Sequence, residues 1–168
     1  MTSMRYTTYD SPLGELLLVA DGAGTALVSV SVPGQRGGAT VQPDWTRDAP
    51  EAPAPVLAEA RRQLDAYFAG ELKEFRLDFA ARGTEFRERV WEALDTIPFG
   101  ATTTYGEIAA RIGASRAAVR AIGGAIGANP LLIVRPCHRV IGADGSLTGY
   151  AGGLERKERL LALEGAAV

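Results

Sequence analysis

Short apolar and β-branched runs, separated by turn-forming residues, occupy the first part of the chain. Residues 4–32 are predicted to form strands, with turns at Asp10–Gly14 and Asp21–Gly24. Two such runs around a DG-type turn are typical of a hairpin or meander. Residues 33–55 contain five of the nine prolines and show no apolar period, so they are predicted to form a long surface loop.

The period changes after this loop. Within Val56–Gly70, apolar side chains recur every three or four positions, at Leu57, Ala60, Leu64 and Phe68. This spacing predicts a helix that stops at Gly70.

A final strand is predicted before the middle of the chain, because Phe75, Leu77 and Phe79 alternate with charged residues. Arg82–Thr84 then interrupts the pattern. We therefore expect two domains, an α/β domain over residues 1–82 and a second domain over residues 83–168.

The second half is predicted to be mostly helical. Three polar residues can each cap a helix: Thr84 before a helix to about Thr96, Thr104 before one to Ile112, and Ser115 before one to Ile126. The last two, joined by a Gly-Ala pair, fit a helix-turn-helix. Residues 131–134 are predicted as a short buried strand, and residues 154–164 as a final helix.

Composition and charge narrow the function classes. Hydrophobic residues make up 46% and charged residues 23%, which excludes wholesale disorder. The apolar runs are far shorter than the roughly 18 residues of a membrane-spanning helix, and no signal peptide is apparent, so we expect a soluble cytoplasmic protein.

The net charge is −2, yet no acidic residue lies between Glu107 and Asp144. That stretch holds five arginines, which suggest either a phosphate-binding face or an ordinary solvated face neutralised by distant carboxylates: Arg111, Arg116, Arg120, Arg135 and Arg139.

The chain has one cysteine and one histidine, and they are neighbours, Cys137 and His138. This excludes an intramolecular disulfide and disfavours a structural zinc site. A thiol beside a base and the cations Arg135 and Arg139 is typical of a nucleophile, whereas a lone cysteine is otherwise a small buried hydrophobe. Neighbouring side chains of an extended segment point apart, so the backbone must turn after Pro136 or a water must link the pair.

A base needs an orienting carboxylate, and spacing leaves that choice open. Glu164 stands out because it lies among leucines. The candidates of this half are Glu88, Glu92, Asp95, Glu107, Asp144, Glu155, Glu158 and Glu164.

The segment Ile133–Gly142, which contains Pro-Cys-His-Arg, resembles the active-site signature of the O6-alkylguanine-DNA alkyltransferases (methylated-DNA–protein-cysteine methyltransferases). Further matches cover most of residues 83–165, and they include 83–86, 97–100, 104–109, 120–123, 129–130 and 149–153. The resemblance implies a mixed α/β (α+β) fold, with an N-terminal ribonuclease H-like sheet domain and a C-terminal helical domain that carries a winged helix-turn-helix.

The resemblance also implies an activity. The protein would flip an O6-alkylated guanine, and also an O4-alkylated thymine, out of duplex DNA and transfer the alkyl group irreversibly to itself. It implies that Cys137 accepts the alkyl group, His138 acts as base through a water, and Glu164 orients His138. Asn129 would fix hydrogen bonds of the site, and Tyr105 would support flipping and donate to the leaving guanine.

The remaining roles also come from the resemblance. The guanine pocket would be lined by Tyr150, Ala151, Gly152 and Val140, with the carbonyls of Val140 and Cys137 accepting from the exocyclic amine. Arg120 would insert into the base stack. Further DNA-binding positions would be Ser115, Arg116, Ala121 and Gly123. No cofactor and no metal is implied. The expected partner is double-stranded DNA bound through its minor groove by a monomer, with cooperativity on DNA left open.

The chain departs from the family pattern at Arg135, a position that is usually aliphatic. A charge there could contact DNA, pair with an acid, or alter the pKa of Cys137. Ala151 stands where serine is frequent. Two other functions remain as alternatives: a non-catalytic winged-helix DNA-binding module, and a cysteine hydrolase that uses Cys137 and His138.

Overall fold

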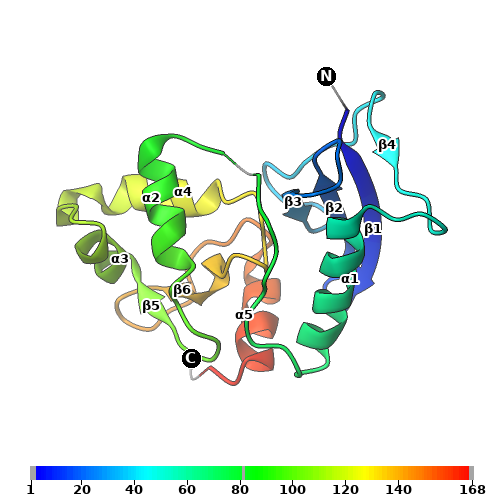
Figure 1. Ribbon diagram of the computed structural model, residues 1–168. Helices are drawn as coiled ribbons and strands as arrows, with labels where there is room; N and C mark the ends of the chain where they lie inside the picture. The colour runs from blue at the N-terminus through cyan, green and yellow to red at the C-terminus, as the bar shows by residue number, and fades with distance from the viewer. Residues whose placement is uncertain (1–2, 81, 167–168) are drawn as a thin grey trace. The chain divides into compact units, whose positions relative to one another are not determined.

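The computed structural model describes residues 3–80 and 82–166, which divide into two compact units with a boundary between residues 81 and 82. The first unit is a sheet with one helix, and the second is mostly helical (Figure 1). This confirms the predicted mixed α+β class. No helix within the described ranges is long and apolar enough to cross a bilayer.

The N-terminal unit is built on a sheet with strand order β3-β2-β1-β4. Strands β1 (Arg5–Ser11), β2 (Gly14–Ala20) and β3 (Leu27–Ser31) form the predicted antiparallel meander. The expected long loop proves to contain a two-residue strand, β4 (Thr46–Arg47), which pairs parallel to β1. A strand this short has no sequence signal of its own.

Helix α1 (Pro55–Phe68) packs against β1 and β2 (Figure 1). Leu57, Ala60 and Leu64 are buried as predicted, but the next buried position is Tyr67, not Phe68. A step of three residues from Leu64 keeps Tyr67 on the same helical face.

The strand predicted over residues 75–79 is wrong. The structure has a single bridge there, between Leu27 and Phe79, in which the main chain of Leu27 bonds to Asp78 and Ala80. Phe79 is exposed, so the alternation of aromatic and charged residues does not reflect a half-buried strand.

The C-terminal unit begins with α2 (Glu85–Leu94), capped by the Thr84 side chain as predicted. Strand β5 (Thr103–Thr104) leads into α3 (Tyr105–Arg111), and the Thr104 side chain accepts a hydrogen bond from Glu107 N, also as predicted. Directly after a short turn at residues 137–139, β6 (Val140–Ile141) pairs parallel to β5, which aligns Thr103 with Val140. The last helix is α5 (Leu154–Leu163).

Two predictions in this unit need correction. The helix expected over residues 116–126 is split into a 3-10 turn, η1 (Arg116–Ala118), and helix α4 (Val119–Gly127), and Ser115 makes no side-chain cap. Residues 131–134 are buried, but residues 132–134 form a turn and not a strand, and the φ angle of Ile133 is 72°. A run of apolar residues signals burial, and burial does not distinguish a strand from a compact buried turn.

Candidate active site

A single 3-10 turn, η2 (Cys137–Arg139), follows Pro136 and carries the predicted nucleophile and base. Cys137 N donates to Arg135 O at 2.8 Å, and Arg139 N donates to Pro136 O at 3.1 Å. The backbone therefore turns after Pro136, which answers the question that the sequence left open. Cys137 is 3% exposed and His138 is fully buried.

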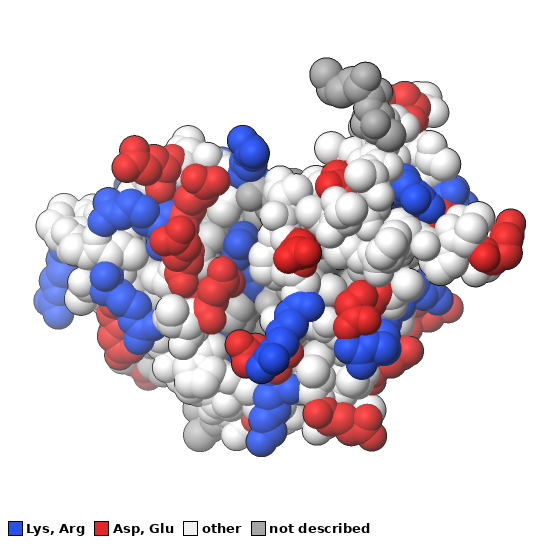
Figure 2. Space-filling model, in the orientation of Figure 1, with Lys and Arg blue, Asp and Glu red and all other residues white. Residues whose placement is uncertain are grey.

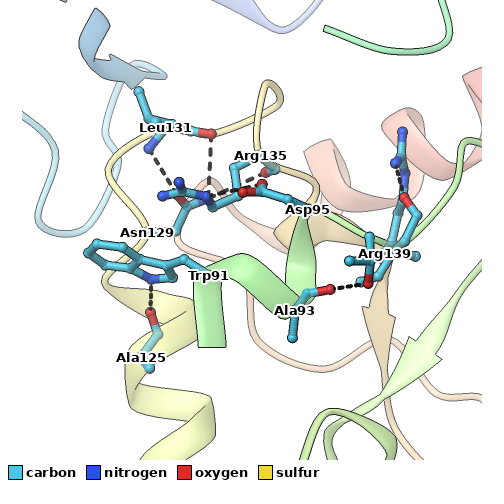
Figure 3. Close-up of polar contacts among 10 residues, drawn as sticks. Trp91, Ala93, Asp95, Ala125, Asn129, Leu131, Arg135 and Arg139 are labelled. Atoms are coloured by element: carbon cyan, nitrogen blue, oxygen red, sulfur yellow. Dashed lines mark hydrogen bonds and ion pairs between the residues drawn. The ribbon is translucent and has the colours of Figure 1, made fainter. Parts of the chain in front are cut away.

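Asn129 braces this turn from the loop after α4. Its Oδ1 accepts from Leu131 N at 3.0 Å, and its Nδ2 lies 3.4 Å from the carbonyl oxygens of both Leu131 and Arg135 (Figure 3). One amide thus holds the start and the end of the segment that leads to Cys137. This residue was expected at the site, and it is 2% exposed.

The thiol of Cys137 sits in a protein interior that opposes its ionisation. Burial raises the pKa of Cys137 to about 11, although hydrogen bonding from Asn129 and the positive charges of Lys157 and Arg135 act in the opposite direction. At neutral pH the isolated site holds a thiol, so a base must remove its proton before attack.

The base has a buried carboxylate partner. His138 Nε2 lies 2.8 Å from Glu164 Oε2, and neither side chain is exposed to solvent. Glu164, the C-cap residue of α5, also accepts from Arg139 Nε at 2.7 Å and from Arg139 Nη2 at 2.9 Å. Arg139 Nη1 donates in turn to Ile97 O at 2.5 Å. Of the eight candidate carboxylates that the sequence offered, the structure brings Glu164 to the histidine.

His138 is set up as a neutral base. Burial lowers its pKa, and Glu164 counteracts only part of that shift. A neutral imidazole that donates Nε2–H to Glu164 keeps a lone pair on Nδ1. Among the described residues Nδ1 has no hydrogen-bond partner, and no hydrogen bond joins it to Cys137. Nδ1 is therefore the atom available to take a proton.

The five arginines of the acid-free stretch, for which the sequence left a phosphate-binding face and a solvated, neutralised face open, divide into two groups. Arg135 and Arg139 are 7% and 6% exposed and pair with Asp95 and Glu164. A short stretch without acids therefore did not mean exposed arginines, because the counter-charges come from α2 and α5. The three that remain exposed are Arg111, Arg116 and Arg120.

The exposed arginines lie on the helix pair α3–α4 and the turn η1 between them. Arg111 donates to the Thr96 side chain, whereas Arg116 and Arg120 are exposed, as are Ser115 and Ala121; Gly123 is half-buried. Figure 2 shows basic and acidic side chains interspersed on one face of the molecule. On that face the charge is mixed, not uniformly basic.

The residues expected around a guanine pocket come from β6 and from the segment that follows it. Val140 and Gly152 are buried, and Tyr150 and Ala151 are half-buried. The Tyr105 hydroxyl, at the start of α3, lies 2.8 Å from Thr148 Oγ1. This contact is not evident in the sequence, where 43 residues separate the two.

Lys157 is a buried cation that sequence reasoning missed. Its Nζ donates to Val140 O at 2.6 Å and to Thr148 O at 2.8 Å, and the residue is 1% exposed. Burial lowers its pKa to about 8. Lys157 thus joins α5 to β6 and to the loop of Thr148, whose hydroxyl contacts the Tyr105 hydroxyl. A lysine between Arg156 and Glu158 on an otherwise polar helix gives no signal of this role.

A groove between α3, η1 and the loop after β6 is lined by Tyr105, Ala109, Ala114, Arg116 and Ala143. It does not reach Cys137, which lies in the interior. Within the described residues, no group of three or more His, Cys, Asp and Glu side chains is arranged to hold a metal ion.

Comparisons with known proteins cover both units. Residues 4–81 match the family described as "6-O-methylguanine DNA methyltransferase, ribonuclease-like domain", and residues 85–166 match its "DNA binding domain". The chain is 52% identical to a methylated-DNA–protein-cysteine methyltransferase of Mycolicibacterium paratuberculosis, over 96% of this chain and 92% of that protein. A protein of the same name from Methanosarcina acetivorans is 49% identical, over 96% of this chain and 99% of that one.

The structure is similar to that of Mycobacterium tuberculosis OGT, which was crystallised in complex with DNA. The TM-score is 0.84 at 51% identity, and the match covers 96% of this chain and 92% of that chain.

Proposed function

The chain belongs to the 6-O-methylguanine DNA methyltransferase family, which repairs DNA by alkyl transfer to a protein cysteine, and from this we propose that Cys137 is its alkyl acceptor. One observation carries the proposal. A protein-cysteine methyltransferase needs a cysteine, and this chain contains one. That cysteine lies on the turn that also presents the buried His138–Glu164 pair.

The first step is activation of the thiol. The proton of Cys137 Sγ moves to Nδ1 of His138 through a bridging water, and Glu164 stabilises the imidazolium that forms. Three features support this route: the raised pKa of Cys137, the lowered pKa of His138, and the hydrogen bond that commits Nε2 to Glu164. Asn129 and Lys157 favour the thiolate once it forms.

The second step is displacement at a saturated carbon. The thiolate forms a sulfur–carbon bond while the carbon–O6 bond breaks, and the electron pair of that bond stays on the guanine. The guanine then takes up one proton from the Tyr105 hydroxyl. The His138 imidazolium returns its proton to Tyr105 through solvent, so the proton lost by the thiol is balanced by one proton on the repaired base. The carbonyls of Cys137 and Val140 select guanine by accepting from its exocyclic amine. Val140 O already accepts from Lys157, and a carbonyl has a second lone pair for this contact.

The product is a thioether, which has no carbonyl for water to attack, so each molecule acts once. The same displacement applies to O4-alkylthymine. The target carbon must first leave the base stack, because a stacked base hides it. We assign that step to Arg120, which is exposed on α4, and to Tyr105 at the start of α3.

DNA binding is supported by the similarity to a relative crystallised with DNA and by the family's DNA-binding domain. We propose contact with the minor groove through α3, η1 and α4, by a monomer. We assign Ser115, Arg116, Ala121 and Gly123 to this contact; the first three are exposed and Gly123 is half-buried. We propose a cytoplasmic location, which is supported by the similarity to bacterial and archaeal relatives, because the chromosome of such cells lies in the cytoplasm.

The test is intact-protein mass spectrometry after incubation with a short duplex that contains O6-methylguanine. We expect a gain of one methyl group per chain without turnover, and no gain for Cys137→Ser. Binding of the duplex by Cys137→Ser should persist, because the thiol lies in the interior. Duplex binding without any mass change in the unaltered chain would contradict the proposal and favour a non-catalytic DNA-binding module. Repeated turnover of an activated ester would favour a hydrolase.

A further inference from the structure

Arg135 lies two residues before Cys137 and is part of the turn that places the thiol. Its carbonyl oxygen accepts from Cys137 N at 2.8 Å and faces Asn129 Nδ2 at 3.4 Å. The whole residue is 7% exposed. Of the three roles that the sequence left open for this charge, contact with DNA is therefore excluded by burial.

The guanidinium of Arg135 is held by Trp91 of α2 and by Asp95, the C-cap residue of that helix. Its Nε lies 3.3 Å from Asp95 Oδ1, and its Cζ lies 5.1 Å from the centroid of the Trp91 ring. Trp91 is itself fixed, because its Nε1 donates to Ala125 O of α4 at 2.9 Å (Figure 3). Ion pairing and a cation–π contact together compensate a buried cation. The Arg135 side chain therefore has one defined position.

The charges around Cys137 are unequally neutralised. Arg139, on the same turn, is bound twice by the buried Glu164, which also holds His138. Lys157, from α5, donates only to backbone carbonyls. The ion pair of Arg135 is with Asp95, whose side chain is 42% exposed, and Arg135 Nε lies 3.3 Å from Asp95 Oδ1.

A half-exposed carboxylate screens a buried cation less well than a buried one does. Arg135 and Lys157 consequently both favour the charged form of Cys137, whereas burial opposes it. The pKa of Asp95 reports the same interaction: partial burial raises it, and the positive charge of Arg135 acts to lower it.

We propose that Arg135 is a positioning residue for alkyl transfer. Its guanidinium, held between Trp91 and Asp95, fixes the turn before Cys137 and supplies positive charge that stabilises the thiolate, and Asp95 limits that charge. The proposal rests on the proposed role of Cys137 as acceptor.

The experiment compares three variants. Arg135→Met keeps the length of the side chain and removes the charge, Arg135→Lys keeps the charge, and Asp95→Asn removes the counter-charge. The ionisation of Cys137 is followed through the ultraviolet absorbance of its thiolate, with Cys137→Ser as the blank. Because the chain has one cysteine, the signal belongs to Cys137. The rate of alkylation by free O6-benzylguanine is measured over the same pH range, and unfolding in urea is measured for each variant.

The expected shifts have opposite signs. Arg135→Met should move the thiolate titration to higher pH, and Asp95→Asn should move it to lower pH. At neutral pH a shift of one unit changes the thiolate fraction about tenfold, and the higher nucleophilicity of the more basic thiolate offsets part of that loss. We therefore expect alkylation by Arg135→Met to fall roughly threefold to tenfold, with Arg135→Lys within about threefold of the unaltered chain.

Some results would overturn the proposal. A titration that stays in place in Arg135→Met, while stability falls, would make the arginine a purely structural residue. Shifts of the same sign in Arg135→Met and Asp95→Asn would exclude a charge effect. If Arg135→Met does not fold, the other two variants still test the proposal. The pH midpoint of the Cys137 titration should stay unchanged in Arg135→Lys and should fall in Asp95→Asn.

Failure of the proposed function has a different signature. The unaltered chain would then gain no alkyl group from any substrate, although the thiolate titrations would still report on Arg135.

Discussion

The two units bury polar side chains of different kinds. In the N-terminal unit the buried polar residues are the neutral Ser29, Ser31 and Gln63. In the C-terminal unit they include five ionisable side chains within one short stretch and the last helix, namely Arg135, His138, Arg139, Lys157 and Glu164. Both units have well-packed apolar cores, so packing does not require these charges.

Burying an ionisable group is costly unless it is paired and hydrogen-bonded. The N-terminal unit meets that cost at a single carboxylate: the Asp48 side chain is 6% exposed, but its partner Arg5 is 27% exposed and Ala54 N also donates to it. The C-terminal unit buries several charged side chains near the Cys137 thiol, and each of them has a defined partner. The contrast identifies the site more directly than any cavity does, and it suggests changes whose effects should differ between the two units.

The largest effect is expected for Glu164→Gln. The substitution removes the carboxylate that pairs with the buried Arg139 and with His138. Breaking a buried ion pair by removing one partner costs about 3–5 kcal/mol, and the urea midpoint should fall accordingly. Glu158→Gln, on the exposed side of the same helix, is the matched control and should change stability by less than about 0.5 kcal/mol. Equal losses in the two variants would contradict the contrast.

Arg120→Ala should separate flipping from chemistry. Extrusion of a base costs a few kcal/mol, so the rate of repair in duplex DNA should fall about tenfold or more. Alkylation by free O6-benzylguanine, which needs no flipping, should change less than about twofold by the same reasoning. Arg76→Ala, an exposed arginine of the N-terminal unit, is the control and should affect neither rate. Parallel losses on both substrates would remove Arg120 from the flipping step.

Thr148→Val tests a contact that is only half-buried. It removes the hydroxyl that lies 2.8 Å from Tyr105 Oη and leaves the Thr148 carbonyl bound to Lys157. A neutral hydrogen bond contributes about 1 kcal/mol, so the single-turnover rate on duplex should fall roughly fivefold. Thr148→Ser keeps a hydroxyl and should recover most of the rate. No change in Thr148→Val would show that Tyr105 is positioned by packing alone.

The smallest effect is expected for Arg5→Gln in the N-terminal unit. Its partner Asp48 keeps the hydrogen bonds from Ala54 N, and the arginine is partly exposed. Such pairs contribute about 0–1 kcal/mol, which urea unfolding can measure. A loss above about 2 kcal/mol would mean that the N-terminal unit also depends on a buried charge, and the contrast between the units would fail.

Local patterns predicted the elements that are set locally. The caps at Thr84 and Thr104, the meander of β1 to β3, and α1 all follow from neighbouring residues, and the structure confirms them. The Cys-His pair was found because both residue types occur once.

What could not be predicted depends on residues far apart in the chain. The pairing of Arg135 with Asp95 spans 40 residues, and that of Arg139 with Glu164 spans 25. A charge pattern along the sequence cannot report counter-charges supplied by other helices, which is why the two arginines were grouped with the exposed ones. Lys157 was missed for the same reason, because its partners are backbone carbonyls that no side-chain pattern marks.

Ile133 lies four residues before Cys137, and it is the one non-glycine residue with a positive φ in the part of the chain that the structure describes. A β-branched residue enters that region at a cost of about 1–3 kcal/mol, and it stays there only when its surroundings leave no alternative. The segment that leads to the nucleophile has, in effect, a single conformation. The entropy of placing the thiol is therefore lost when the protein folds, and none of it remains to be lost when a damaged base arrives.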